Sequence, residues 1–510
     1  MSKYLICILV YINLELVLCK YLSFKNKGES NLNILLVASE AHPFIKTGGL
    51  GDVIGALPNE ISKLGENIRV VVPKYSDISE GIKKKLKYIG SFTVNVGWRN
   101  QYCGIFEYNY NGVKFYFLDN EYYFKRSGLY GYYDDGERFA FFSRAVLEFI
   151  KHIDWIPEII HCNDWQTAMI PVLYKLEYAK DNKLKNIKTV LSIHNLLFKG
   201  MYSPEILPEL FGYDYEPYFN GSLEHNGAIS ILKGGINYSD KILTVSKTYA
   251  DEIKTQEYGE GLHGLLKYRE NYLEGIVNGI DYTEYNPKTD KYIWSRYDVK
   301  TIEDKGINKE NLQKELNLPI NKEIPLLGLV SRLTNQKGCN LIINILNELL
   351  NEDIQIVILG TGDYYYEEEF RKFSNIYPDK LSANIKFSNE LAHQIYASAD
   401  MFLMPSLFEP CGLGQLIALR YGAIPIVRET GGLKDTVDKY DEDKEEGNGF
   451  TFKNYDNKEL LNTVKYALNI FKNKDRWNKI IENAMKADNS WERSSREYIR
   501  VYRELVNSID

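Results

Sequence analysis

This 510-residue sequence lacks two common phosphate-binding loops where they would be expected. No G-x-G-x-x-G motif follows the first apolar strand, and no G-K-[ST] loop occurs. Such loops bind phosphates through backbone N–H groups in dinucleotide-dependent dehydrogenases and in P-loop enzymes. The sequence therefore argues against both of these enzyme classes.

Cysteines are few and show no pattern. The six of them, Cys7, Cys19, Cys103, Cys162, Cys339 and Cys411, form no C-x-x-C pair and have no regular spacing. The sequence therefore indicates neither a zinc site nor a disulfide framework. It is typical of a protein that works in a reducing compartment.

A concentration of positive charge is also missing. The formal net charge is −7 and is spread along the chain, with only a short basic run at residues 83–85. A nucleic-acid partner is not expected, because proteins that bind nucleic acid carry a basic patch or stripe. Hydrophobic residues make up 44% of the chain, which is enough for two or more substantial cores.

Long apolar runs are absent, apart from one near the N-terminus. The uncharged segment 4–14 follows Lys3, is too short to span a bilayer, and precedes a basic segment at 20–27. This pattern resembles a signal or organelle-targeting sequence, so residues 1–32 are predicted to be a leader. A disordered extension is the alternative, because Glu15 interrupts the apolar character. No stable membrane association is expected.

From residue 33 onward, short apolar runs alternate with helical patterns, as in an α/β domain with a mostly parallel sheet. A polar stretch at 278–323 separates this alternation from a second one. We predict two doubly wound domains, at 33–280 and 281–487, and a terminal amphipathic helix within 488–510. The predicted strands are 34–38, 68–72, 113–118, 158–161, 189–194 and 241–245, and then 325–330, 354–359, 385–387, 401–404 and 424–427.

A glycine-rich loop at residues 46–52, with the sequence K-T-G-G-L-G-D, follows the first predicted strand and opens a helical pattern. Adjacent glycines let backbone N–H groups approach a ligand, and a helix start favours negative charge. The pattern T-G-G-L-x-D recurs at residues 430–435, again after a predicted strand. Two such loops in two halves of the chain predict one anion-binding site between two domains.

Several other polar residues follow predicted strands. Arg332 and Lys337 could together bind a diphosphate and neutralise a departing nucleotide, although two ordinary solvated cations would look the same. His161 and His194 each end a strand, which favours a site over two structural histidines. Glu409, between a strand and a helix, is compatible with a buried loop carboxylate or with an acceptor for sugar hydroxyls.

Taken together, these motifs resemble the starch and glycogen synthases of glycosyltransferase family 5. The resemblance covers nearly all of the chain from residue 33 onward, with the motifs in the same order. The segments that carry it are 46–50 (KTGGL), 163–165 (NDW), 194–195 (HN), 278–281 (NGID), 331–338 (SRLTNQKG), 409–413 (EPCGL) and 430–433 (TGGL).

The resemblance implies an α/β, GT-B fold, in which two Rossmann-like domains face each other across a cleft and the last helix packs back on the first domain. It implies a retaining glucosyltransferase that moves glucose from ADP-glucose to the non-reducing end of an α-1,4-glucan, without a metal or another cofactor. The absence of a D-x-D-type carboxylate pair at an obvious strand end agrees with this. The alternatives are UDP-glucose as donor, a catalytically silent glucan-binding homologue, and a GT-B enzyme similar to sucrose synthase or phosphorylase.

The matching positions imply roles for individual residues. Arg332 and Lys337 would hold the diphosphate, His194 would contact the transferred glucose, Asp164 would lie near the sugar or the acceptor, and Glu409 would accept hydrogen bonds from glucose hydroxyls. The other substrate-binding candidates are Lys46, Gly48, Gly49, Asn278, Cys411, Gly412, Leu413, Thr430, Gly431 and Gly432. The leader and the family together predict a plastid location, with a cytoplasmic one as the alternative.

Overall fold

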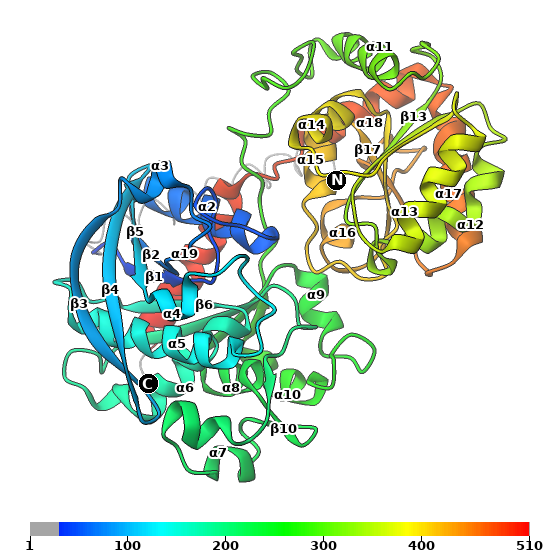
Figure 1. Ribbon diagram of the computed structural model, residues 1–510. Coiled ribbons are helices and arrows are strands. Elements are labelled where there is room, and N and C mark those ends of the chain that lie inside the picture. Colours follow the sequence, from blue (N-terminus) through cyan, green and yellow to red (C-terminus); the bar gives the residue numbers. More distant parts are fainter. Residues whose placement is uncertain (1–29, 509–510) are drawn as a thin grey trace, which may run out of the picture.

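The computed structural model describes residues 30–508. They form two α/β domains, and the chain crosses between them twice (Figure 1). Buried hydrophobic side chains gather in two clusters, one mostly from residues 32–276 and 491–502 and the other from residues 280–485. Except for residues 30–32, the predicted leader lies outside the described part of the chain.

The first domain is built on a nine-stranded sheet with the order β12-β11-β7-β6-β1-β2-β5-β4-β3. Its neighbouring strands are parallel except in the pairs β3–β4 and β4–β5. The strands are β1 (Asn33–Val37), β2 (Asn67–Pro73), β3 (Lys87–Val96), β4 (Arg99–Tyr110), β5 (Val113–Asp119), β6 (Ile159–Asn163), β7 (Lys188–Ile193), β11 (Lys241–Thr244) and β12 (Leu273–Gly275). A small sheet adds β8 (Met201–Tyr202), β9 (Glu224–His225) and β10 (Ala228–Ser230).

Helices cover both faces of this sheet (Figure 1), which explains why its central strands are continuous apolar runs. The longer helices are α2 (Gly49–Lys63), α5 (Asp135–Lys151), α6 (Met169–Leu176), α8 (Ile231–Tyr238), α9 (Lys247–Glu252) and α10 (His263–Tyr268). The short ones are α3 (Glu80–Lys83), α4 (Glu121–Phe124) and α7 (Glu216–Phe219). The predicted α/β organisation is confirmed.

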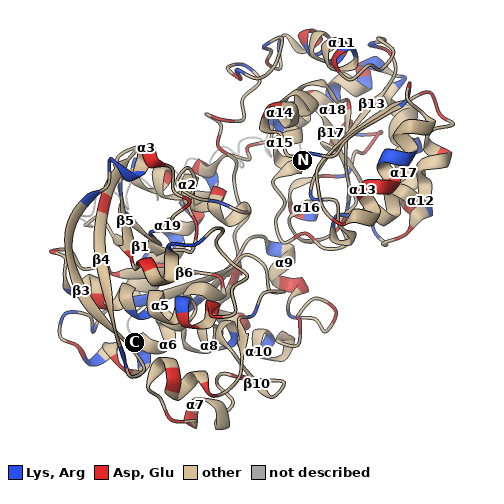
Figure 2. Cartoon of the chain, in the orientation of Figure 1, with Lys and Arg blue, Asp and Glu red and all other residues tan. Residues whose placement is uncertain are grey.

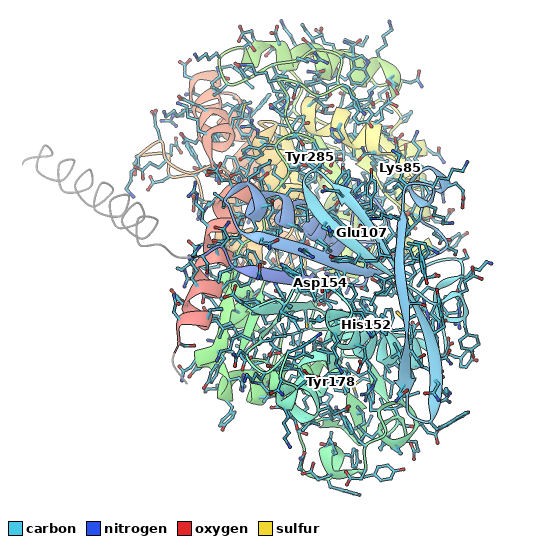
Figure 3. The ribbon with its side chains drawn as sticks, turned by 90° about the vertical axis from the view of Figure 1, so that its left-hand side faces the viewer. Lys85, Glu107, His152, Asp154, Tyr178 and Tyr285 are labelled. Carbon is cyan, nitrogen blue, oxygen red and sulfur yellow. The ribbon has the colours of Figure 1, made fainter. Side chains whose placement is uncertain are left out.

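The long hairpin of β3 and β4 at the edge of the sheet was missing from the sequence prediction (Figure 3, where Glu107 marks β4). The signal was present, because Phe92, Val94 and Val96 alternate with exposed residues along β3. Such a pattern is typical of a strand with one face on the core and one in solvent. The hairpin makes the first sheet mixed rather than parallel throughout.

The second domain has a six-stranded, fully parallel sheet with the order β15-β14-β13-β16-β17-β18, the classic dinucleotide-fold order 3-2-1-4-5-6. Its strands are β13 (Leu326–Val330), β14 (Gln355–Leu359), β15 (Leu381–Asn384), β16 (Met401–Met404), β17 (Ile424–Arg428) and β18 (Phe450–Phe452). Its helices are α11 (Lys305–Glu315), α12 (Cys339–Leu349), α13 (Tyr364–Ile376), α14 (Asn389–Ser398), α15 (Gly414–Arg420), α16 (Gly431–Thr436), α17 (Asn457–Phe471) and α18 (Lys474–Lys486).

One predicted strand of this domain was wrong. Residues 385–387 do not form a strand, because β15 is already complete at Asn384 and the chain then turns toward α14. The turn leaves Phe387 with 87% of its surface exposed, just beyond the carboxyl edge of the sheet. An aromatic ring that is so exposed at this edge is a candidate for ligand stacking.

The two crossings between the domains run side by side. Ile280 pairs with Ser490, and the Ile280 N–H donates to the carbonyl of Asn489 (2.9 Å). Gly279 lies so close to the second crossing that a Cβ there would be 2.4 Å from the backbone nitrogen of Trp491. Beside the crossings a cavity of ≈ 80 Å³ is lined by residues of both domains, among them Tyr285 (Figure 3). These two hydrogen-bonded crossings are the covalent connections between the domains.

The terminal helix α19 (Trp491–Asn507) packs on the first domain (Figure 1). Its Tyr502 hydroxyl hydrogen-bonds to His161 Nδ1 (2.7 Å), and Arg503 forms an ion pair with Glu66 (2.6 Å). His161 is fully buried, and its Nε2 contacts Ser192 Oγ (2.7 Å). His161 is therefore a structural histidine that ties α19 to the sheet, and the expectation of a site role for it was wrong.

Charges of both signs are interspersed over both domains (Figure 2). Among residues 30–508, no helix is long and apolar enough to cross a membrane. In the same part of the chain, no group of three or more histidine, cysteine, aspartate or glutamate side chains is arranged to hold a metal ion.

Candidate active site

In doubly wound sheets, ligands bind at the carboxyl ends of the strands where the strand order reverses. In the second domain that point lies between β13 and β16, and in the first between β1 and β6. The loops after β13 and β16 carry Arg332, Lys337 and Glu409. Those after β1 and β6 carry Lys46 and Asp164. The predicted site residues thus come from both switch points.

Lys337 and Glu409 form an ion pair in the second domain, with 2.5 Å between Lys337 Nζ and Glu409 Oε2. Both side chains are largely buried, and Ser406 Oγ also donates to Glu409 Oε2 (3.2 Å). A buried carboxylate needs such partners. The sequence left two readings of Glu409 open, and in this structure it is a buried loop carboxylate with one oxygen occupied.

Backbone contacts hold the two loops together. Gly338 adopts φ +76°, and a Cβ there would lie 2.2 Å from the carbonyl oxygen of Pro405. The Leu407 N–H donates to the carbonyl of Gln336 (2.8 Å). Only glycine permits this approach, which brings Lys337 to Glu409.

Arg332 lies at the start of the same loop, and its side chain is exposed. Within residues 30–508, no hydrogen bond or ion pair involves its guanidinium group. An exposed, unpaired arginine beside a buried lysine at the switch point provides donors for an anionic ligand.

The second glycine loop packs under the Glu409 loop. A Cβ on Gly431 would lie 1.9 Å from the carbonyl oxygen of Glu409, and one on Gly432 would lie 2.1 Å from that of Cys411. The Gly431 N–H donates to both carboxylate oxygens of Glu252 (3.1 Å each), and the Gly432 N–H donates to the carbonyl of Glu409 (3.1 Å). In this arrangement both amides are occupied, and the glycines support the loop that carries Glu409.

Helices α9 and α16 join the domains on this side. The Thr248 N–H and hydroxyl donate to Asp435 (2.9 and 2.6 Å), while the Thr430 hydroxyl donates to Glu252 (2.9 Å). Ser246 Oγ donates to the carbonyl of Pro410 (2.6 Å). Asp435 of the second domain therefore caps the first turn of α9, and Glu252 of the first domain caps the first turn of α16.

Cys411 is buried among hydrophobic side chains of the first domain, although it belongs to the second in sequence. Burial raises the pKa of its thiol to about 12, so it stays protonated. The backbone N–H of Asn278 hydrogen-bonds to the thiol. Gly412 follows at φ +76°, and the Leu413 side chain lies 4.0 Å from the position that a Cβ of Gly49 would occupy. These candidates thus form the seam between the domains.

In the first domain, Asp164 and His194 lie together. Asp164 Oδ1 accepts a hydrogen bond from the His194 backbone N–H (2.7 Å) and one from that of Asn195 (3.5 Å). Asp164 has φ +56°, a conformation that a residue other than glycine adopts at a cost of about 1–3 kcal/mol and that is frequent at functional sites.

His194 is held in one tautomer. Asn163 Nδ2 donates to the Val37 carbonyl (3.0 Å), which turns Asn163 Oδ1 toward His194 Nε2 (2.9 Å). His194 Nε2 must then carry the proton, so Nδ1 is an acceptor. Burial lowers the pKa of His194 to about 4, and the imidazole is therefore neutral near pH 7.

Lys46 is ion-paired with Asp52, with 2.7 Å between Nζ and Oδ1, and both side chains are partly exposed. Gly51 makes room for this lysine, because a Cβ there would lie 2.4 Å from Lys46 Cβ. Gly48 has open space around its Cα. The first glycine loop thus has free space beside Gly48, whereas the glycines of the second are packed against the Glu409 loop.

Four residues beside the candidate site were not among the residues predicted for it, namely Glu40, Asp52, Asn163 and Phe387. Glu40 and Asn163 adjoin predicted strand ends, so their positions were a usable signal. Asp52 lies in the predicted glycine-rich loop, but its ion pair with Lys46 depends on loop geometry that the sequence does not show. The exposure of Phe387 depends on loop geometry in the same way.

The environment of Asp164 predicts a pH effect on stability. Burial raises the pKa of its carboxyl to about 7, whereas an unfolded aspartate has a pKa near 3.8. Between these values the folded chain holds a proton that the unfolded chain has released. This contribution to stability is therefore present at low pH and is lost as pH rises through 7.

Replacing Asp164 with asparagine, which tolerates positive φ, should remove this contribution. Denaturant unfolding at pH 5 and at pH 8 would measure it. We expect a smaller loss of stability between the two pH values for Asp164→Asn than for the unmodified chain. An equal loss in both proteins would mean that the Asp164 carboxyl titrates normally.

Comparison with known proteins agrees with this geometry. Residues 33–268 match the family model described as starch synthase catalytic domain, and residues 309–486 match glycosyl transferases group 1. The glycogen synthase of Clostridium perfringens is 61% identical over 94% of this chain and 100% of its own length. The chain belongs to the glycogen and starch synthase family. A glycogen synthase of Caldicellulosiruptor bescii is 55% identical, again over 94% of this chain and 100% of its own length.

Solved structures of the family and beyond give the same fold. The catalytic domain of starch synthase IV from Arabidopsis thaliana, bound to ADP and acarbose, superposes with a TM-score of 0.87 at 33% identity, over 94% of this chain and 100% of that one. Sucrose-phosphate synthase from Thermosynechococcus elongatus, at 15% identity and a TM-score of 0.58, covers 93% of this chain and 99% of its own and shares the fold alone. The predicted GT-B fold is confirmed.

Membership of the glycogen and starch synthase family confirms the predicted activity in its general form. The chain transfers glucosyl units onto a glucan in starch or glycogen biosynthesis. The predicted plastid location was wrong, because the similar glycogen synthases come from bacteria, which have no plastids. The cytoplasmic alternative fits these relatives better.

Proposed function

We propose that the chain transfers glucose from ADP-glucose to the non-reducing end of an α-1,4-glucan, with retention of the anomeric configuration. The observation that carries the proposal is the composition of the two switch points. One presents Arg332 and the Lys337–Glu409 pair, and the other presents Asp164, His194 and the accessible loop of Lys46. A donor between them would meet cations at its diphosphate and hydrogen-bond acceptors at its sugar.

The donor diphosphate would bind in the second domain. Arg332 has free donors, and Lys337 supplies a second positive charge. When sugar hydroxyls also hydrogen-bond to the Glu409 carboxylate, that carboxylate neutralises Lys337 less fully, and the lysine charge then acts on the ligand. As the nucleotide leaves, negative charge grows on its terminal phosphate, and fixed cations stabilise that charge without reorganising. These side chains would supply the charge that other enzymes take from a metal ion.

The nucleobase would stack on Phe387. This ring is 87% exposed at the carboxyl edge of the second sheet, two strands away from β13. A base–aromatic stack is worth about 1–3 kcal/mol and does not depend on which base is present. The ring therefore supports a nucleotide donor, and support for adenine comes from the Arabidopsis relative, whose structure contains ADP.

The glucosyl unit would lie between the domains. His194 Nδ1 is an acceptor for a glucose hydroxyl, and the free Glu409 oxygen is another. The bond between the anomeric carbon and the phosphate oxygen breaks, and a bond to the acceptor 4-hydroxyl oxygen forms on the same face. The hydroxyl proton passes to the departing phosphate. Glu409 is held by Lys337 and Ser406, so it is assigned to sugar binding rather than to nucleophilic attack.

A donor competition experiment tests the proposal. Purified protein is given glycogen and equal concentrations of ADP-glucose and UDP-glucose, each with a different isotope in glucose. We expect glucose from ADP-glucose to dominate the polymer. Preferred incorporation from UDP-glucose would refute the donor assignment, and no incorporation from either donor would favour the silent glucan-binding homologue.

A further inference from the structure

Glu40 is a buried carboxylate directly beneath the first glycine loop. It lies three residues beyond β1 and is 4% exposed. Its Oε2 accepts hydrogen bonds from the Thr47 backbone N–H (2.5 Å) and from the Thr47 hydroxyl (3.2 Å). Oε2 also lies 3.4 Å from the position that a Cβ of Gly51 would occupy, so the first turn of α2 packs over it.

The position of Glu40 in the sheet is that of a site residue. It follows β1 at the switch point of the first domain, and Asp164 follows the adjacent strand β6. In the second domain, the equivalent loops hold Lys337 and Glu409. Burial is the main cause that raises the pKa of the Glu40 carboxyl, and the charge of Asp164 adds to it.

A carboxylate in this place is costly by itself. Among the described residues, no lysine, arginine or histidine forms an ion pair with Glu40, and burial raises the pKa of its carboxyl. A buried charge that has only hydrogen bonds for compensation stabilises the fold less than an apolar residue of similar size can. What its hydrogen bonds do achieve is to fix Thr47, the residue between Lys46 and Gly48.

We propose that Glu40 is a positioning residue that fixes the loop of residues 46–49, so that Lys46 meets the donor when the cleft closes. The inference rests on the proposed function, since it assumes that Lys46 approaches the donor diphosphate. Glu40 acts through Thr47, whose amide and hydroxyl it holds from below.

The chain offers a matched control in Glu66. This residue is also a buried glutamate of the first domain, and its Oε2 accepts a hydrogen bond from a backbone N–H, that of Leu32 (2.7 Å). It lies beside the opposite end of β1 and is paired with Arg503 on α19. Replacing it perturbs the same domain without touching the glycine loop.

Steady-state kinetics of Glu40→Gln and Glu66→Gln form the first test. Glutamine keeps the shape but loses the charge that strengthens both hydrogen bonds, so we expect kcat/KM for ADP-glucose to fall about tenfold in Glu40→Gln. The KM for glycogen should not change, and Glu66→Gln should keep wild-type kinetics. The proposal would be overturned if Glu40→Gln changed only the KM for glycogen. It would also be overturned if kcat/KM for ADP-glucose fell equally in Glu66→Gln.

A double-mutant cycle with Lys46→Ala tests the route of the effect. If Glu40 acts through Lys46, Glu40→Gln should cost little further activity once Lys46 is gone. A full tenfold loss of kcat/KM in the Lys46→Ala background would show that Glu40 acts elsewhere.

If Glu40→Gln fails to fold, Thr47→Val removes one of the two hydrogen bonds from the loop side. It should give a smaller decrease in kcat/KM for ADP-glucose, with the KM for glycogen unchanged.

Hydrogen exchange in the ligand-free protein tests the contact between Glu40 and the loop without any donor present. The amide of Thr47 should exchange at least tenfold faster in Glu40→Gln than in the wild type, and at an unchanged rate in Glu66→Gln. Unchanged protection in Glu40→Gln would overturn the proposal. A wild-type protein that transfers no glucose from ADP-glucose would instead refute the proposed function, while the exchange rates still test the loop contact.

Discussion

Replacing Lys337 with alanine is expected to lower kcat for glucosyl transfer by about 10³-fold, the loss found when one preorganised group is removed from a site of developing charge. Lys337 is largely buried and is one of only two cations on the loop after β13. If the diphosphate leaves beside Lys337, as we propose, the lysine charge acts mainly in the transition state. The decrease should therefore appear in kcat as well as in kcat/KM. Steady-state kinetics with ADP-glucose and glycogen would measure it.

Lys309 provides the control for this experiment. Its Nζ lies 2.6 Å from Asp400 in a buried ion pair of the same domain, and it packs away from the switch point. Breaking a buried pair leaves a charge without compensation and destabilises by about 3–5 kcal/mol. Both alanine variants should lower the free energy of unfolding, but only Lys337→Ala should lower the kcat of the folded fraction. Full activity of folded Lys337→Ala would rule out its proposed role at the diphosphate.

His194→Ala is expected to reduce kcat/KM by about 10²-fold, because the variant loses the group that we propose contacts the sugar during transfer. The neutral imidazole is fixed by Asn163, and its Nδ1 faces away from that contact as an acceptor. With a pKa of about 4, it should not contribute a titration to the activity between pH 6 and 8. Kinetics across this range for the wild type and the variant would measure both effects.

A comparison of His161→Ala with His194→Ala distinguishes a structural histidine from one in the site. His161 lies on β6 and its ring bridges Tyr502 and Ser192. His161→Ala should loosen α19 and lower the free energy of unfolding, with little change in kcat of the folded enzyme. If His161→Ala and His194→Ala lost the same activity, or if His194→Ala kept wild-type rates, the assignment of His194 to the glucosyl site would have to be abandoned.

The sequence predicted the strand ends well, because parallel strands buried on both faces are continuous apolar runs with polar residues after them. Arg332, Asp164 and His194 could be located for that reason. Sequence reasoning could not assign different roles to His161 and His194, since both end a strand. The distinction depends on α19, which returns from the far end of the chain to cover one of them.

The two glycine loops also show that similar sequence motifs can have different roles in the structure. Their sequences are alike, and both follow strands, so the pattern predicted an anion at each. In the structure the amides of Gly431 and Gly432 are hydrogen-bonded to Glu252 and Glu409, and both glycines pack against the Glu409 loop. The first loop also has amides bound from below, by Glu40, but the space beside Gly48 is open. A local motif indicates that a backbone can approach something closely, but only the packing between loops decides what that is.

The contacts at the domain seam suggest how the open loop would come to the donor. Ser246, Thr248 and Glu252 already bind the second domain on one side, and the paired crossings at 279–281 and 489–491 join it on another. A rotation about these connections would move Lys46 relative to Arg332 and Lys337. Closing lids and domains of this kind commonly govern turnover.

The central claim is that residues from both switch points build one site that transfers glucose with retention. The most direct measurement follows the reaction of ADP-glucose with a short α-1,4-linked maltooligosaccharide by proton NMR, which resolves the anomeric signals of donor and product. We predict one new α-1,4-linked glucose at the non-reducing end for each ADP released. A β-linked product, or release of glucose and ADP without elongation of the acceptor, would contradict the account.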